Sequence, residues 1–402
     1  MSIVEVKNSI LRGTVQIPPS KSVSHRALIC SYLAGGGSVG PIIDSNDMRA
    51  TRQVLQAFAN GSSSANCIES GSTMRFLIPV AAALGLDITF VGEGSLLTRT
   101  VGEYLDLLPR HGVSVESDGC LPMRISGRLQ PGDYSIAGDV SSQYLTGLLL
   151  ALPLLEGDSR IELTTQLQSK PYVDMTVKVM SEYGVVVEEG DKGYFVPGNQ
   201  KYKICDYNVE SDWSQAAFFL AAGVIGGDIT LTGLDMDSTQ GDKAIVDILR
   251  RFGGDITVDG TGIRAVASQL TGTVIDATDT PDLVPILAVV AAHAQGETVI
   301  TGAERLRYKE SDRLLSVCDN LERMGAQVTP HNDGMTIVGG RLKGARLDGY
   351  NDHRIVMSFC VAALDAEGDT AITDPMSINK SYPSFFDDYN NLGGRANVLN
   401  DR

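Results

Sequence analysis

The sequence predicts an α/β protein made of two globular halves, each with three similar units. The main observation is a repeat of about 70 residues, in which a helix-like hydrophobic run ends in glycine and a short β-prone stretch follows, as in "AAALGLDITF" and "AAGVIGGDITL". Two kinds of helix alternate within the repeat, and one of them is hydrophobic on all sides. Alternating helices and strands are typical of the α/β class.

Two series of glycines mark the repeat. Glycine after the last helical turn is the expected left-handed cap, so each position predicts a helix end. The first series has steps of 69 to 72 residues and consists of Gly85, Gly157, Gly227, Gly296 and Gly368. The second series has steps of 68 to 72 residues and consists of Gly112, Gly184, Gly253, Gly325 and Gly393. A looser first copy, "SYLAGGGSVG" followed by "TRQVLQAFANG", raises the number of units to six.

The helices of the two series differ in their hydrophobic pattern. Residues 144–156, 215–225 and 283–294 are hydrophobic nearly all round, so we expect them to be buried on every side. Residues 101–112 and 310–325 are amphipathic, which predicts one face on a sheet and one in water. Six buried helices cannot share one centre, but two groups of three can. The alternative, an extended solenoid, would need polar capping repeats and a longer array.

Composition and charge exclude several classes of function. With 402 residues, 43% of them hydrophobic, the chain can form two or three domains. A formal net charge of −16 argues against a nucleic-acid surface. No segment reaches the roughly 18 hydrophobic residues of a membrane span, and the first 17 residues lack the pattern of a signal peptide, so we expect a cytoplasmic protein without membrane contact. The spacing of the six cysteines and five histidines predicts reduced thiols and no metal site.

Polar residues stand immediately before each hydrophobic helix. A helix start offers unpaired N–H groups and partial positive charge, which favour a bound anion. Serine or aspartate can also act only as a helix cap, which is the simplest explanation for any single motif. Capping does not explain the cations that accompany these motifs, Lys21, Arg26, Arg75, Arg99, Arg313, Arg354 and Lys380. Together they predict a cleft between the two halves that binds a ligand with several anionic groups.

A second cluster of charges lies in "RLRYKESDRL", residues 305–314. Taken alone, these charges would be unremarkable on an exposed helix. Asp282, however, stands at the start of a hydrophobic helix, where a carboxylate must be paired, cap the helix or take part in chemistry. Together with Lys309 and Glu310, it forms a candidate set of proton-transfer residues.

Seven motifs spanning the chain resemble one enzyme family. In chain order they are "PSKSVSHRAL", "ESGSTMRFL", "SSQYLTGLL", "SKPYVD", "YKESDRL", "NDHRIVMSF" and "NKSYPSFF". The family is 3-phosphoshikimate 1-carboxyvinyltransferase, also called enolpyruvylshikimate-3-phosphate synthase. The resemblance implies transfer of the carboxyvinyl group of phosphoenolpyruvate to the 5-hydroxyl of shikimate 3-phosphate, with release of phosphate, in aromatic amino-acid biosynthesis and without a cofactor.

The resemblance also implies an architecture. We expect a two-domain inside-out α/β barrel, in which each domain has three βαβαββ units around buried helices and a two-strand hinge joins the domains. One domain would comprise residues 1–17 and 211–402 and the other residues 18–210, with the active site in the cleft between them. A monomer that binds only small-molecule substrates is the expected state.

The resemblance assigns roles by position in the motifs. Asp282 is the expected base toward the 5-hydroxyl, Lys309 contacts that hydroxyl or the phosphate oxygens, and the acid toward the methylene carbon is Glu310 or Lys21. The expected ligands of shikimate 3-phosphate are Lys21, Ser22, Arg26, Ser141, Ser142, Gln143, Ser169, Tyr172, Asp282, Arg305 and Lys309. The expected ligands of phosphoenolpyruvate are Lys21, Gly71, Arg75, Arg99, Gln143, Arg313, Arg354 and Lys380.

Three positions depart from the family pattern. His25, Glu69 and Arg305 each stand where many members have asparagine. Glu69 leaves the response to the family's inhibitor glyphosate undetermined. Arg305 changes one expected phosphate contact, which a cation there could strengthen.

Two other functions stay open at this point. The sister enzyme that uses UDP-N-acetylglucosamine typically has Lys-Asn after its first strand and a cysteine in the loop before the arginine. This chain has Lys21-Ser22 and the cysteine-free "GEGSLLTRT". A non-catalytic anion-binding protein of the same fold would have lost the proton-transfer residues, yet Asp282, Lys309 and Glu310 are present.

Overall fold

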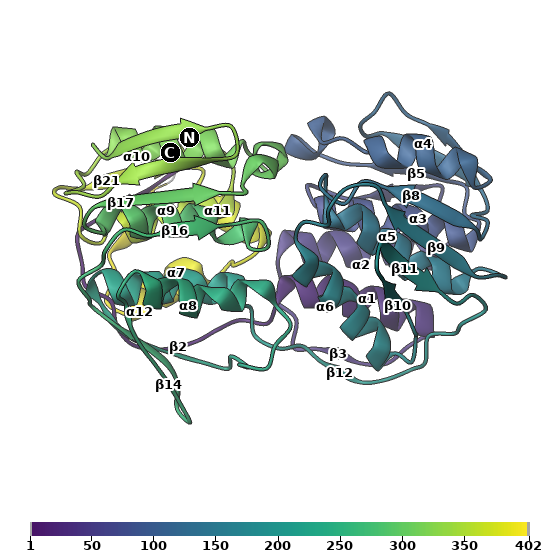
Figure 1. The fold of residues 1–402 in the computed structure, drawn as a ribbon, viewed down its shortest axis with the longest axis horizontal. Helices are drawn as coiled ribbons and strands as arrows, with labels where there is room; N and C mark the ends of the chain where they lie inside the picture. Colours follow the sequence, from purple (N-terminus) through teal and green to yellow (C-terminus); the bar gives the residue numbers. More distant parts are fainter. Residues whose placement is uncertain (1, 400–402) are drawn as a thin grey trace. The chain divides into compact units, whose positions relative to one another are not determined.

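The computed structural model describes residues 2–399 and shows a mixed α/β chain, which confirms the predicted class. The chain divides into two compact units (Figure 1). Unit 1 comprises Met1–Pro18 and Glu210–Arg402, and unit 2 comprises Pro19–Val209. Unit 1 is therefore assembled from two segments of the chain, whereas unit 2 is one continuous segment.

The helices of unit 2 are of two kinds. They are α1 (Lys21–Ala34), α2 (Asn46–Ala59), α3 (Gly71–Leu84), α4 (Gly102–Arg110), α5 (Ser142–Ala151) and α6 (Lys170–Glu182), with the 3-10 helices η1 (Gly94–Thr98) and η2 (Leu152–Leu154). α3 and α5 are buried along nearly their whole length, whereas α2 and α4 bury one face. α3 packs against α5 and α2, and α1 packs against α2 and α6.

Two four-stranded sheets and one two-stranded sheet complete unit 2. The first has the order β4 (Ser64–Asn66), β5 (Ile88–Val91), β7 (Met123–Gly127) and β6 (Val113–Glu116). The second has the order β10 (Glu188–Gly190), β11 (Gly193–Val196), β9 (Ser159–Leu163) and β8 (Asp133–Ile136). The small sheet pairs β3 (Val39–Gly40) with β12 (Tyr207–Asn208).

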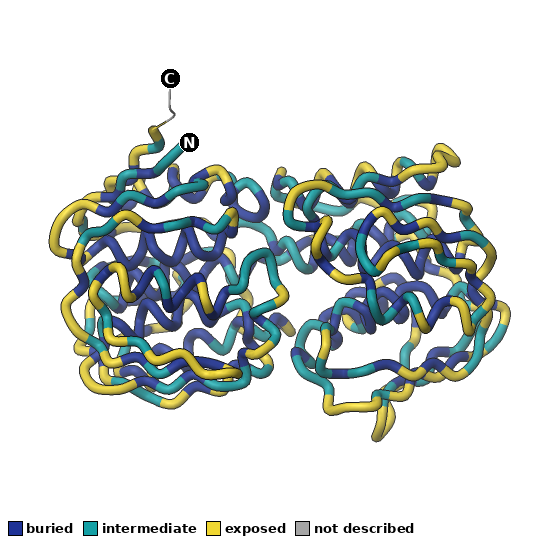
Figure 2. Tube along the Cα trace, turned by 90° about the horizontal axis from the view of Figure 1, so that it is seen from above, coloured by how far each residue is buried: buried dark blue, intermediate teal, exposed yellow. Residues whose placement is uncertain are grey.

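The helices of unit 1 repeat the division into buried and amphipathic. They are α7 (Trp213–Gly226), α8 (Ile245–Arg251), α9 (Val284–His293), α10 (Arg313–Arg323), α11 (His353–Ala362) and α12 (Phe385–Asn391), with η3 (Gly241–Ala244), η4 (Pro281–Leu283), η5 (Glu304–Tyr308) and η6 (Pro375–Lys380). α9 buries every residue from Val284 to Ala292, α11 is buried along its whole length and α7 along most of its length. Figure 2 shows such buried helical segments in dark blue. This all-round burial follows from their continuous hydrophobic sequence.

Three four-stranded sheets cover these helices. The first has the order β14 (Asp255–Asp259), β15 (Gly262–Val266), β13 (Asp228–Thr232) and β2 (Arg12–Gln16). The second has the order β16 (Val274–Asp276), β17 (Glu297–Thr301), β19 (Gly334–Val338) and β18 (Gln327–His331). The third has the order β20 (Arg346–Leu347), β21 (Thr370–Thr373), β1 (Ile3–Val6) and β22 (Ala396–Leu399).

All five four-stranded sheets share one strand pattern, a parallel pair followed by two antiparallel pairs. In the sheet of β16, for example, Val274 pairs with Val299 in parallel, and Glu297 then pairs with Val338 in antiparallel register. None of the sheets in residues 2–399 closes on itself. The expected six-unit barrel therefore stays a prediction.

The two glycine series differ in backbone conformation. Every glycine of the second series has a positive φ, from 74° at Gly184 to 98° at Gly393. In the first series the predicted left-handed cap is wrong at Gly157 and Gly227, which lack a positive φ. α7 ends instead at an extended Gly227 with φ of −108°, where an added Cβ would lie 2.7 Å from the Leu11 carbonyl oxygen. Glycine is needed at this position for a close backbone approach.

Membrane-spanning helices are not found in residues 2–399. None of the helices there combines the length and hydrophobicity that a bilayer requires.

Candidate active site

The first turns of α1 in unit 2 bury Arg26. Its side chain donates hydrogen bonds to Thr176 Oγ1 at 2.8 Å, to the Ser22 carbonyl at 2.7 Å and to the Tyr172 carbonyl at 3.0 Å. Burial lowers the pKa of Arg26 to about 10, so the guanidinium is charged at neutral pH. Because all three acceptors are uncharged, they orient the positive charge without neutralising it. Lys21 differs, since its Nζ lies 2.8 Å from Asp47 Oδ2 of α2.

The start of α3 gathers the expected phosphoenolpyruvate residues of unit 2. Arg75 donates to Gln143 Oε1 at 2.8 Å, and Gln143 donates to Ser72 Oγ at 2.9 Å. The guanidinium of Arg99 covers Gly71, where an added Cβ would lie 2.6 Å from Nη1. A larger residue at this position would force the Arg99 side chain to move. The structure brings this group of expected residues together.

The serines expected to bind the substrate phosphate stand at two helix starts. Ser141 caps α5 through its hydroxyl, and Ser142 follows in the first turn. Ser169 precedes α6 with a φ of 56°, and its carbonyl accepts a hydrogen bond from Tyr172 N at 3.0 Å. A positive φ is unfavourable for serine, and such strain is concentrated at functional sites. The Tyr172 carbonyl ties this turn to Arg26.

Glu69, one of the departures from the family pattern, contacts the loop that carries Arg99. Its Oε1 accepts a hydrogen bond from Ser95 N at 3.2 Å. Gly94 leaves no room for a Cβ beside this carboxylate. Glu69 therefore helps to hold the loop in place.

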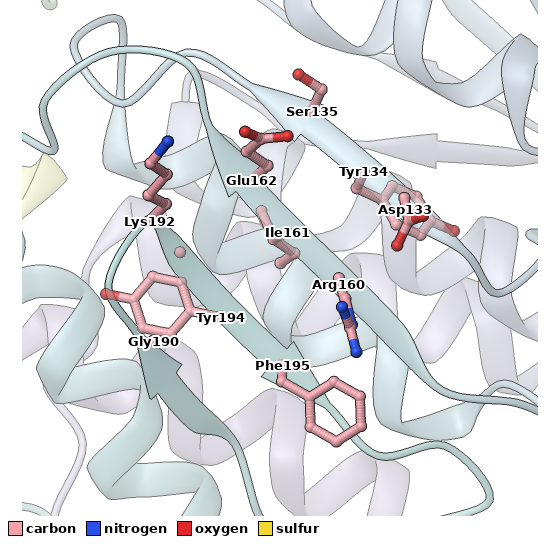
Figure 3. Close-up of a pocket in the computed structure, with 11 residues that line it drawn as sticks. Asp133, Tyr134, Ser135, Arg160, Ile161, Glu162, Gly190, Lys192, Tyr194 and Phe195 are labelled. Carbon is pink, nitrogen blue, oxygen red and sulfur yellow. The ribbon is translucent and has the colours of Figure 1, made fainter.

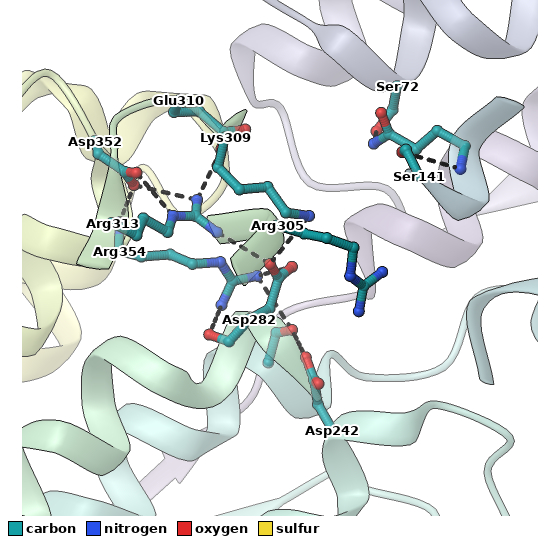
Figure 4. Close-up of polar contacts among 12 residues, drawn as sticks. Ser72, Ser141, Asp242, Asp282, Arg305, Lys309, Glu310, Arg313, Asp352 and Arg354 are labelled. Carbon is teal, nitrogen blue, oxygen red and sulfur yellow. Dashed lines mark hydrogen bonds and ion pairs between the residues drawn. The ribbon is translucent and has the colours of Figure 1, made fainter. Parts of the chain in front are cut away.

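In unit 1, Asp282 of η4 lies among three cations (Figure 4). Its Oδ1 is 3.0 Å from Arg313 Nη1 and 3.8 Å from Lys309 Nζ, and its Oδ2 is 2.9 Å from Arg354 Nη2. Burial raises the pKa of Asp282, but together the charges of Arg354, Lys309 and Arg313 lower it by more, to well below its ordinary value. Asp282 is therefore ionised at neutral pH, and the same three charges make it a weaker base than an ordinary aspartate.

Arg313, the first residue of α10, is the centre of this cluster. It is 1% exposed, and it donates to Asp352 Oδ2 and Glu310 Oε2 at 2.8 Å each and to Asp282 Oδ1 at 3.0 Å. The carboxylates of these three residues face the three cations Lys309, Arg313 and Arg354. Three negative charges thus stand against three positive charges, and these six groups together do not have the expected excess of positive charge.

Lys309 has a pKa that is shifted toward neutral pH. Burial lowers its pKa to about 8, although the charge of Asp282 acts in the opposite direction. A lysine with such a pKa can exchange protons under physiological conditions. The charge of Arg305 also lowers the pKa of Lys309, and Figure 4 shows the two side chains next to each other. Arg305 additionally donates to the Thr278 carbonyl at 2.7 Å.

Lys380, at the end of η6, is buried and donates to the Asn351 carbonyl at 2.7 Å. Asn351 itself has a φ of 48°, so an unfavourable backbone conformation presents this carbonyl.

Sequence reasoning missed the role of Asp352. It stands in the "NDHR" motif, where a helix cap was the simplest explanation. It does cap α11, accepting a hydrogen bond from Arg354 N at 2.9 Å, but it also forms the buried ion pair with Arg313. No signal in the sequence indicates this second role, since the two residues are 39 positions apart.

Sequence reasoning also missed Asp242 of η3. This buried carboxylate accepts a hydrogen bond from Ser214 Oγ, and the same hydroxyl lies 3.2 Å from Arg354 Nη2. Burial and, after it, the charge of Asp282 raise the pKa of Asp242 to about 7. Asp242 is thus a fourth carboxylate, connected to the cluster through Ser214.

Two hollows in the surface are lined by other residues. One, of about 520 Å³, lies on the sheet of β8 to β11 beside Arg160 and Lys192 (Figure 3). The other, of about 300 Å³, lies beside His293 and Asp365. Neither is lined by a residue expected in the site. In residues 2–399, no group of three or more His, Cys, Asp or Glu residues could hold a metal ion.

Comparisons with known proteins agree on one family. A family model described as EPSP synthase (3-phosphoshikimate 1-carboxyvinyltransferase) matches residues 6–64 and 55–389. Proteins named 3-phosphoshikimate 1-carboxyvinyltransferase from Clostridium kluyveri and Clostridium novyi are 43% and 39% identical, each alignment covering 98% of both chains. The solved structure of EPSP synthase from Acinetobacter baumannii superposes with a TM-score of 0.84 at 26% identity, covering 100% of both chains. The chain therefore belongs to the EPSP synthase family.

Proposed function

We propose that this protein transfers the carboxyvinyl group of phosphoenolpyruvate to the 5-hydroxyl of shikimate 3-phosphate and releases phosphate, as its family membership indicates. The observation that carries the assignment of chemistry is the position of Asp282, an ionised carboxylate within 4 Å of Lys309, Arg313 and Arg354. A buried cluster of this kind is costly to form and is concentrated at functional sites, which supports a role in the reaction. The sister activity on UDP-N-acetylglucosamine lacks comparable support, because the full-length relatives carry the shikimate name.

The reaction proceeds by addition and then elimination. A proton is added to the methylene carbon of phosphoenolpyruvate, which makes the neighbouring carbon electrophilic. Asp282 accepts the proton of the 5-hydroxyl, whose oxygen forms a bond to that carbon and gives a tetrahedral intermediate. The C–O bond to phosphate then breaks, and the residue that protonated the methylene carbon takes a proton back from the new methyl group, which restores the double bond. The acid in the first step is Glu310, which has to bind a proton beside Arg313 at 2.8 Å before it can donate one, or the ammonium group of Lys21, 2.8 Å from Asp47.

The substrate contacts are proposed from the motifs and supported by the local geometry of each unit. Phosphoenolpyruvate is bound by Lys21, Gly71, Arg75, Arg99, Gln143, Arg313, Arg354 and Lys380. Shikimate 3-phosphate is bound by Lys21, Ser22, Arg26, Ser141, Ser142, Gln143, Ser169, Tyr172, Asp282, Arg305 and Lys309. Charge-assisted hydrogen bonds from arginine suit both carboxylate and phosphate groups.

The finer architecture is part of the same proposal. We expect six βαβαββ units, three around each group of buried helices, and domains of residues 1–17 with 211–402 and of residues 18–210. The shared strand pattern of the five four-stranded sheets supports this repeat. The monomeric state and the cytoplasmic location stay predictions.

Release of inorganic phosphate from the two substrates tests the function directly. The purified protein should release phosphate only when both shikimate 3-phosphate and phosphoenolpyruvate are present. Replacing shikimate 3-phosphate by UDP-N-acetylglucosamine should abolish the release. If phosphoenolpyruvate released phosphate with UDP-N-acetylglucosamine but not with shikimate 3-phosphate, the protein would have the sister activity. If it released phosphate with neither acceptor, the result would support a non-catalytic binding protein.

A further inference from the structure

Four buried side chains form a hydrogen-bond chain that connects three helices of unit 2. His25 Nδ1 of α1 lies 2.7 Å from Thr51 Oγ1 of α2, which lies 2.7 Å from Thr73 Oγ1 of α3. Thr73 Oγ1 donates to Ser70 Oγ, the cap of α3, at 2.8 Å. None of the four residues is more than 1% exposed. Water therefore cannot replace a bond that is lost from this chain, so each bond matters more than a surface one.

The chain has a single direction because each hydroxyl has only one hydrogen to donate. Thr73 uses its hydrogen on Ser70, so Thr51 has to donate to Thr73. Thr51 then has no hydrogen left for His25, and the imidazole has to donate from Nδ1. The opposite tautomer would place two acceptors against each other at 2.7 Å, with no proton between them.

The imidazole of His25 is held in the neutral form. Burial and, after it, the charges of Lys21 and Arg26 keep the pKa of His25 well below its ordinary value. With the proton on Nδ1, the lone pair is on Nε2, which is buried and makes no hydrogen bond within residues 2–399. The ring also meets Phe76 edge-on, with centroids 6.1 Å apart. Within residues 2–399, Nδ1 is thus the only nitrogen of this ring that makes a hydrogen bond.

The chain ends where the proposed phosphoenolpyruvate residues begin. Ser70 Oγ also accepts a hydrogen bond from Thr73 N at 3.2 Å, so Thr73 holds the cap with both of its donors. The residue after the cap is Gly71, which the guanidinium of Arg99 covers closely. A small displacement of the helix start would therefore disturb this packing.

α2 supports the start of α1 in the same way. Asp47 precedes Thr51 by four residues, and residues at this spacing share one helix face. Asp47 is the ion-pair partner of Lys21 at 2.8 Å. One face of α2 thus supports the starts of α1 and α3, two of the helix starts at which we propose that anions bind.

We infer that His25 is a positioning residue, which donates from Nδ1 to Thr51 and through Thr73 fixes the start of α3 for phosphoenolpyruvate binding. His25 is almost completely buried and acts through these residues. The identity of the ligand rests on the proposed function, whereas the direction of the hydrogen-bond chain does not.

Two substitutions of similar size separate positioning from mere packing. In His25→Asn the amide nitrogen can take the place of Nδ1, whereas in His25→Gln the amide reaches the place of Nε2. We expect His25→Asn to keep the KM for phosphoenolpyruvate within about threefold. His25→Gln should raise it about tenfold, equivalent to about 1.4 kcal/mol, with a smaller change in kcat. Equal KM values in two variants of equal melting temperature would overturn the inference.

The tautomer can be measured in the wild-type protein even if a variant fails to fold. Long-range ¹H–¹⁵N correlation spectra of protein with ¹⁵N-labelled histidine distinguish an Nδ1–H ring from an Nε2–H ring. We expect His25 to show Nδ1–H and not to titrate between pH 6 and 8. An Nε2–H or a protonated ring would overturn the inference. Absence of phosphate release by the wild-type protein would instead count against the proposed function and leave the tautomer result valid.

Discussion

Two arginines expected in the site of each unit are held in opposite ways. In unit 2, Arg26 and Arg75 donate to carbonyl, hydroxyl and amide oxygens, all of them uncharged. In unit 1, Arg313 and Arg354 donate to the carboxylates of Asp282, Glu310 and Asp352. Unit 2 therefore presents positive charge that attracts an anion, whereas unit 1 contains buried ion pairs beside Lys309, whose pKa is about 8. The first arrangement suits binding and the second suits chemistry.

The largest expected effect comes from removing the charge of Asp282. Asp282→Asn keeps the size of the side chain but removes the proton acceptor, so kcat should fall by about 10²- to 10⁴-fold. Phosphate release measures kcat, and calorimetry measures binding of shikimate 3-phosphate. A variant that still binds this substrate but turns it over at a near-normal rate would show that Asp282 is not the base.

A smaller effect is expected from Arg75→Gln in unit 2. Loss of one charged donor should raise the KM for phosphoenolpyruvate by about 10- to 100-fold, with less change in kcat, since a hydrogen bond to a charged group contributes about 1.5 to 3 kcal/mol. Arg124→Gln is the matched control, because Arg124 of unit 2 is 48% exposed and pairs with Asp87 at the surface. If both variants raised the KM equally, the charge of Arg75 would have no specific role in binding.

The smallest effect concerns the pH dependence of stability. Asp242 has a pKa raised to about 7, so the folded protein binds this proton more tightly than the unfolded chain does. Its contribution to stability is complete below about pH 4, the ordinary pKa of aspartate, and is lost as the pH rises through 7. The side chain at this position does not titrate in Asp242→Asn. As the pH rises from 5 to 8, the melting temperature of the variant minus that of the wild type should therefore increase by about 1–3 °C. A constant difference across this range would contradict the shift.

Much of the fold could be predicted because the buried helices have an unambiguous pattern. Residues 283–294 are hydrophobic on all sides, and α9 is indeed buried all round. The amphipathic pattern of residues 310–325 predicted a helix, and α10 is found there, with Asp312 as its cap and Arg313 as its first residue. Backbone details were harder to predict, as Gly227 shows: a glycine needed for close approach to Leu11 looks the same in sequence as a left-handed cap.

The support of the site could not be predicted, because it depends on contacts between distant segments. Asp352 reaches Arg313 across 39 residues, and Thr51 reaches His25 across 26. Local periodicity contains no information about such pairs, which are set by how helices pack. The motifs indicate which residues meet the ligand, whereas only the structure shows which residues hold them.

The division of unit 1 into two chain segments has a consequence for its biosynthesis. β1 lies between β21 and β22, so a strand made at the beginning of translation has to pair with two made near its end. At about 5–20 residues per second, the ribosome needs roughly 20–80 seconds to reach these partners. Residues 19–209 are synthesised in about half that time. Unit 2 can therefore fold while β1 and β2, which precede it in the nascent chain, still lack their partner strands.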